Sequence, residues 1–84
     1  MPEATEILNQ EIRNMIAKII EVDVNRISMD AHFVDDLGAD SMMALEIMSA
    51  IEKKYKITIS EDDLIKLIDL RHTLDLVTGL IPTK

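Results

Sequence analysis

The sequence contains no cysteine and no tryptophan, and it has only one tyrosine and one phenylalanine. The absence of cysteine excludes disulfides, thiolate catalysis and cysteine metal sites together. Any thiol chemistry must therefore come from a cofactor. Because aromatic residues are so few, the core must be built from Ile, Leu, Val and Met, which suits helices packed through aliphatic side chains.

Long hydrophobic runs are also missing, and none approaches the length needed to cross a bilayer. The first six residues contain no basic segment of the kind that opens a secretory signal, so we expect a cytoplasmic protein. At 84 residues, the chain is expected to form one domain over residues 1–84. Such a domain has a modest core and no deep substrate cavity.

Basic residues are scarce, because nine of them stand against sixteen acidic residues and give a net charge of -7. This balance argues against nucleic acid and anionic membranes as partners and favours basic protein surfaces. No Lys or Arg occurs between Arg26 and Lys53, and the acids in this stretch are Asp30, Asp35, Asp36, Asp40, Glu46 and Glu52. The stretch is either a solvated face that aids solubility or a surface for a basic partner.

Apolar residues recur every three or four positions in two long segments, which predicts amphipathic helices over residues 5–20 and 41–55. Residues 21–40 between them show no sustained period. A connection of this length is unusual in so small a domain and normally indicates function or local anchoring. Its scattered apolar residues, Phe33 and Val34 among them, are expected to hold it against the helices.

The remainder of the chain predicts two further helices. Ser60 followed by three acids matches a capping pattern and predicts a short helix over residues 61–67. Another helix is expected with Thr73 as its N-cap and Pro82 as its stop. The predicted fold class is therefore all-α, a small four-helix bundle of three main helices and one short helix.

Residues 35–46, which read D-D-L-G-A-D-S-M-M-A-L-E, lie where the irregular connection gives way to the second long helix. A helix entrance leaves backbone N–H groups unpaired and carries the positive end of the macrodipole. A phosphate ester on Ser41 would therefore be stabilised there. Asp40 or Ser41 can also be an ordinary N-cap, so the serine alone does not establish an attachment site.

Two catalytic or metal-binding interpretations of this segment are disfavoured. Ser41 and His32 with a nearby aspartate would suggest a nucleophilic triad, but the sequence has no G-x-S-x-G motif and no strand to carry one. A calcium loop opening at Asp35 would need polar ligands where Leu37 and Ala39 stand. We therefore rank a hydrolase last and expect no metal site.

Met42 lies on the side of the second long helix that faces away from the core. The core side is formed by Ala44, Ile47, Met48, Ile51 and Tyr55. Met43 lies on a flank. A large apolar residue facing outward beside Ser41 indicates a partner contact, although single exposed apolar residues are common. Methionine also adapts its shape to different surfaces.

The segment D-D-L-G-A-D-S-M at residues 35–42 resembles the modification motif of acyl carrier proteins, in which D-S-L is usual. The similarity continues in residues on both sides: Phe33, Val34, Leu45, Glu46, Ile51, Glu52, Ile59, Lys66 and Leu67. The resemblance implies a carrier whose Ser41, beside Gly38 and Asp40, receives 4'-phosphopantetheine from coenzyme A through a phosphopantetheinyl transferase. The thiol of that arm would carry acyl groups as thioesters, and the protein itself would catalyse nothing.

The resemblance also implies a partner face and an acyl pocket. The partner face comprises Asp35, Asp36, Met42, Met43, Glu46 and Glu52. The pocket would lie between the second and third helices, and its candidate residues are Ile47, Met48, Ile51, Leu64 and Leu67. These five are alternatively simply core. Such a carrier is expected to be a monomer that docks synthases, transferases and other basic-surfaced enzymes of fatty acid, polyketide or related lipid biosynthesis.

Three features depart from the family pattern. Met43 stands where many fatty acid carriers have an acid, and Lys53 and Lys54 stand where the helix often ends in consecutive acids. Leu64 and Ile65 make the third helix more apolar than is common. A specialised carrier therefore competes with a housekeeping fatty acid carrier. The alternative from another class is an unmodified acidic helical module that docks a basic partner through Met42.

Overall fold

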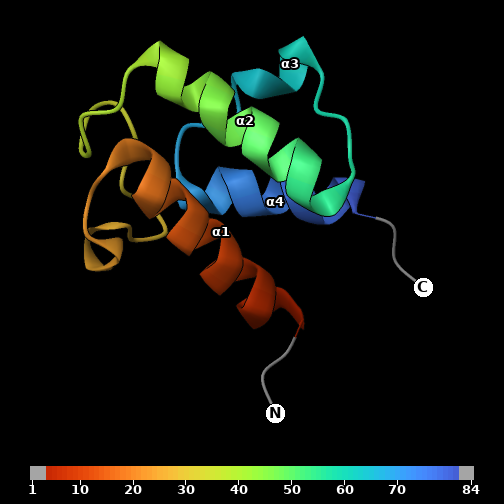
Figure 1. The fold of residues 1–84 in the computed structure, drawn as a ribbon, viewed down its shortest axis with the longest axis horizontal. Helices are drawn as coiled ribbons and strands as arrows, with labels where there is room; N and C mark the ends of the chain where they lie inside the picture. The colour runs from red at the N-terminus through yellow and green to blue at the C-terminus, as the bar shows by residue number, and fades with distance from the viewer. Residues whose placement is uncertain (1–3, 82–84) are drawn as a thin grey trace.

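The computed structural model describes residues 4–81, and in that part of the chain all regular structure is helical. The elements are α1 (Ala4–Ile20), the 3-10 helix η1 (Val24–Arg26), α2 (Ser41–Tyr55), α3 (Glu61–Leu64) and α4 (Leu70–Leu80). Helix α1 packs against α2 and α4, while the short α3 packs against α2 (Figure 1). The predicted all-α bundle with three main helices and one short helix is confirmed. No helix among these is both long and apolar enough to span a membrane.

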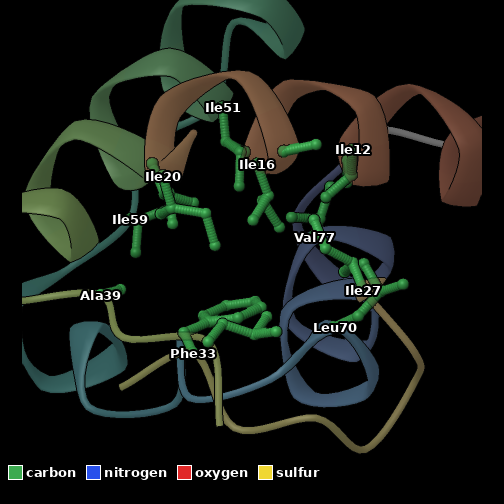
Figure 2. Close-up of a cluster of buried hydrophobic side chains, with 13 residues drawn as sticks. Ile12, Ile16, Ile20, Ile27, Phe33, Ala39, Ile51, Ile59, Leu70 and Val77 are labelled. Atoms are coloured by element: carbon green, nitrogen blue, oxygen red, sulfur yellow. The ribbon is translucent and has the colours of Figure 1, made fainter. Parts of the chain in front are cut away.

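The core is aliphatic, as the lack of aromatic residues predicts. Its fully or nearly fully buried members come from α1, α2, α4 and the long connection: Ile12, Ile16, Ile20, Ile27, Phe33, Ile47, Ile51, Leu70 and Val77. Figure 2 shows the side chains of α1 pointing toward Phe33, which rises from the connection on the other side of the cluster. The single phenylalanine therefore fills the space between the helices and the connection.

The middle of the long connection, residues 29–33, is bonded to residues 68–71, just before and at the start of α4. Phe33 N donates to Ile68 O at 2.8 Å, and Arg71 N donates to Met29 O at 2.9 Å. The guanidinium of Arg71 also pairs with Asp30, with Nε 2.7 Å from Oδ1. The long connection is therefore anchored at several points and follows a defined path.

Val34 does not help to anchor this connection, so that expectation is wrong. Its side chain is 48% exposed, whereas Phe33 is 2% exposed and Leu37 is 8% exposed. The reason is local, since residues 32–38 form a tight turn in which consecutive side chains point in different directions. Phe33 takes the inward position and Val34 the outward one.

Helix α3 is shorter than expected. Helix α3 ends at Leu64 and not at residue 67, because the chain then tightens into turns in which Lys66 N donates to Asp63 O and Leu67 N to Leu64 O. Ser60 caps α3 as predicted, with its side chain accepting from Asp63 N.

Asp69, and not Thr73, is the N-cap of α4. Asp69 Oδ1 accepts from His72 N at 2.8 Å, which satisfies a donor in the first turn. Thr73 lies inside the helix, fully buried, and its hydroxyl donates to Asp69 O at 2.7 Å. A carboxylate four residues earlier thus takes the capping role. The expected stop at Pro82 lies outside the described residues.

The pair between Asp30 and Arg71 predicts a pH-dependent coupling. Hydrogen bonding from Arg71 lowers the pKa of Asp30 below its ordinary value of 3.8. A carboxylate with a lowered folded pKa stabilises the fold above its unfolded pKa, and that stabilisation is lost as the pH falls through the folded pKa. In a double-mutant cycle of Asp30→Asn and Arg71→Gln by urea unfolding, the coupling should be present at pH 7 and shrink below about pH 4. A coupling that is unchanged at pH 3 would contradict this.

Candidate functional site

The segment before α2 is a tight turn that ends at Gly38. Asp36 N and Leu37 N donate to His32 O at 2.8 and 3.1 Å, and Gly38 N donates to Val34 O at 3.2 Å. Gly38 has a φ of 76°, in the left-handed region that glycine adopts without strain. The chain then returns to the core, because Ala39 is 6% exposed and its N–H donates to Phe33 O at 2.8 Å.

His32 and Asp36 close this turn from both ends. The ring Nδ1 of His32 accepts from Val34 N and Asp35 N, each at 3.2 Å. In return, Asp36 Oδ2 accepts from His32 N at 2.7 Å. This reciprocal arrangement resembles a helix capping box. The triad interpretation of His32 gains no support from it, since the ring nitrogen bonds to its own loop.

Asp40 is the N-cap of α2, which decides between the two candidate caps. Its Oδ1 accepts from Met43 N at 3.0 Å, and its backbone is extended. Ser41 is consequently the first helical residue, and its side chain is exposed. Among the described residues, its hydroxyl makes no hydrogen bond. The loop therefore presents Ser41 to solvent at the entrance of α2.

The acids and methionines of the predicted partner face differ in their exposure to solvent. Asp35, Asp36, Met42 and Glu46 are exposed, with Met42 at 64%. Met43 is half-buried and packs against the core. Glu52 is also half-buried, and its Oε2 accepts from Ile59 N at 2.7 Å. The structure thus brings four of these six residues to the surface around Ser41.

Several contacts around the site were not anticipated from the sequence. Neither the loop-closing role of His32 and Asp36 nor the bond from Ile59 N to Glu52 follows from hydrophobic periodicity. The sequence signal for the closed loop is His32 followed four residues later by Asp36, which stands two residues before Gly38. Leu45 and Ile65, which are 39% and 77% exposed, add apolar surface beyond Met42.

The five candidate pocket residues come from α2, α3 and the turn that follows α3, and the three on α2 lie in or against the core cluster shared with α1 and α4. Ile47, Ile51 and Leu67 are buried, whereas Met48 and Leu64 are half-buried. An acyl chain entering here would have to displace packed side chains. The pocket remains a prediction. Ile47 and Ile51 are fully buried, as expected if they are core residues. In the described part of the chain, no group of three or more acids and histidines is placed to hold a metal ion.

Comparison with known proteins identifies the family. Residues 10–77 match the family described as "Phosphopantetheine attachment site". The chain is also 36% identical over 81 residues to the "Polyketide-8 synthase acyl carrier protein 2" of Streptomyces avermitilis, covering 94% of this chain and 93% of that protein. The chain belongs to the acyl carrier protein family. Its cofactor is the covalently attached 4'-phosphopantetheine of that family.

Other similar proteins agree with this assignment. The carrier is 36% identical over 72 residues to the acyl carrier protein of Buchnera aphidicola, covering 86% of this chain and 91% of that protein. Its fold resembles the solved "apo doublet acyl carrier protein from prodigiosin biosynthesis", with a TM-score of 0.79 over the whole chain. That solved chain is only 20% identical and is matched over 42% of its length, so this comparison shows the fold alone.

Substitutions at the two glycines predict opposite effects on the carrier. Gly38→Ala should lower the free energy of unfolding by about 1 kcal/mol, because alanine strains at a positive φ, although an added Cβ would meet nothing within 4 Å. Gly79→Ala is the matched control, since Gly79 lies inside α4 with open space around it. It should raise the free energy by about 0.5 kcal/mol. Urea unfolding measures both, and changes of the same sign would contradict the assigned backbone conformations.

Proposed function

We propose that Ser41 is the attachment residue and that its Oγ forms the phosphodiester with 4'-phosphopantetheine. The observation that carries this proposal is the exposed, unbonded hydroxyl at the first position of α2. The bound arm supplies a thiol that holds acyl groups as thioesters, a group that the cysteine-free chain lacks. The chain itself contributes position and surface, and we propose that it catalyses no step.

The residues around Ser41 suit a phosphate ester. As the first two helical residues, Ser41 and Met42 have no intrahelical acceptor for their N–H groups. The positive end of the α2 dipole favours negative charge at the same place. Asp40 caps Met43 N, and Gly38 turns the chain toward the helix. These two residues therefore fix where the serine stands and need not touch the arm themselves.

Partner enzymes would dock on the exposed acids around this serine. Asp35, Asp36 and Glu46 would attract basic patches on a phosphopantetheinyl transferase and on acyl synthases and transferases, mainly by raising the association rate. Met42 would fill an apolar recess beside them. Because the arm is tethered, weak and rapidly exchanging docking is sufficient. Glu52 would act indirectly, by holding the loop after α2.

The proposed role lies in fatty acid, polyketide or related lipid biosynthesis. The relative from Streptomyces avermitilis is named for polyketide-8 synthase, and this supports polyketide chemistry. The lysines at the end of α2 favour a specialised carrier over a housekeeping one. A single domain over residues 1–84, a monomeric state and a cytoplasmic location remain predictions.

Intact mass after incubation with coenzyme A, magnesium and a broad-specificity phosphopantetheinyl transferase tests the assignment of Ser41. We expect the native chain to gain one phosphopantetheinyl group and Ser41→Ala to gain none. Ser49→Ala is the matched control, because Ser49 is an exposed serine on the same helix, and it should be modified like the native chain. Modification of Ser41→Ala, or no modification of the folded native chain, would refute the proposal and favour the unmodified interaction module.

A further inference from the structure

The outward side of α2 carries charges of opposite sign at its two ends. At 100° per residue, five residues of α2 share this side, and all five are exposed. The exposed C-cap residue Lys56 follows them in a left-handed conformation, outside the helix. We call these five residues and the C-cap the outer row: Met42, Leu45, Glu46, Ser49, Lys53 and Lys56. The first half is apolar and acidic, and the second half ends in two lysines. Glu46 and Lys53 are seven residues apart, or about 10 Å along the helix.

The neighbouring charges at the second half of α2 are engaged within the carrier. Glu52 is half-buried and accepts from Ile59 N at 2.7 Å. Lys54 Nζ lies 3.9 Å from Glu11 Oε2 and 5.9 Å from the centre of the Tyr55 ring. The acid of this half is therefore turned inward, and Lys53 and Lys56 are the charges that α2 and its C-cap present to an approaching protein.

We propose, building on the proposed function, that the outer row selects a partner enzyme with a basic patch facing Glu46 and an acidic patch facing Lys53 and Lys56. A uniformly basic docking face would match the first half and be repelled by the second. Like charges brought together at an interface reject the wrong partner. Lys53 and Lys56 are thus specificity-determining residues of this carrier, and the paired charges also fix the direction in which α2 lies on its partner.

The probe for this proposal is a fatty acid ketosynthase whose carrier-binding face carries only Lys and Arg. Its dissociation constant is measured at low salt for the native carrier, Lys53→Glu and Lys18→Glu. Both variants change the net charge equally, but Lys18 is exposed on α1. We expect Lys53→Glu to bind roughly fivefold more tightly than native, and Lys18→Glu to change affinity by less than about twofold.

A second form of the probe tests the sign of the proposed contact. When one arginine of its docking face is changed to glutamate, the native carrier should gain affinity relative to Lys53→Glu. Equal gains for Lys53→Glu and Lys18→Glu, no gain for Lys53→Glu, or no binding of Lys53→Glu to the basic probe would overturn the proposal. Intact mass of each variant after transferase treatment is recorded separately, so a failure of Ser41 modification is distinguished from a failure of partner selection.

Discussion

Ile51→Ala is expected to lower the free energy of unfolding by about 3 kcal/mol, the value typical of a large aliphatic side chain removed from a well-packed core. Ile51 is fully buried on α2 and lies in one cluster with Ile16 of α1 (Figure 2). Removing three carbon atoms there loses their transfer free energy and leaves a cavity that the stiff neighbouring helices fill poorly. Urea unfolding followed by far-UV circular dichroism measures the loss.

Ile65→Ala is the matched control for that substitution. Ile65 is 77% exposed in the turn after α3, so the same change should alter the free energy of unfolding by less than about 0.5 kcal/mol. Similar losses at the two positions would show that the burial assigned to them is wrong. A loss below about 1 kcal/mol for Ile51→Ala would indicate a core that collapses around the cavity.

Phe33→Leu is expected to impair both stability and modification. Phe33 is 2% exposed, and its backbone joins two parts of the fold, since its N–H donates to Ile68 O and its carbonyl accepts from Ala39 N. Leucine fills less of the space, which should cost about 1 to 2 kcal/mol. The turn that presents Ser41 would keep its backbone bonds but pack less tightly against the core. The initial rate of phosphopantetheine transfer should therefore fall by more than the unfolded fraction explains.

Val34→Ala separates the two effects of the Phe33 substitution. Val34 is the next residue of the same turn but is 48% exposed, so its truncation should change stability by less than about 0.5 kcal/mol. The transfer rate is compared at a temperature where circular dichroism shows every variant folded. If Phe33→Leu is modified at the native rate under those conditions, Phe33 does not position the site.

Helix α2 could be predicted with its observed bounds because the apolar period starts directly after two adjacent capping residues, Asp40 and Ser41. Either cap places the start of the helix within one residue, and the structure assigns the cap to Asp40. The start of α4 could not be predicted, because Asp69 and Thr73 are both good caps. Only the folded chain shows that Thr73 is buried, with its hydroxyl bonded to Asp69 O. Both residue types can cap a helix, and tertiary packing decides that Asp69 is the cap.

In the site too, features set by neighbouring residues could be predicted from the sequence, and those set by residues outside the helix could not. The exposure of Met42 follows from its angle on the helix, and the exposed serine follows from the motif. The inward turn of Glu52 depends on Ile59, seven residues later and outside the helix. A pattern with the period of one helix carries no signal for such a bond. The sequence shows the lysines at the second half of α2, but only the structure shows that Glu52 is engaged by the loop that follows.

The bonds from Phe33 to Ile68 and from Arg71 to Met29 also bear on the order of events during synthesis. A chain grows from its N-terminus, so residues 29–33 leave the ribosome well before their partners at positions 68 and 71. Until those partners emerge, the segment that presents Ser41 lacks its anchors. A nascent chain should thus be a poor substrate for the transferase until residues 68–71 have emerged and these bonds have formed.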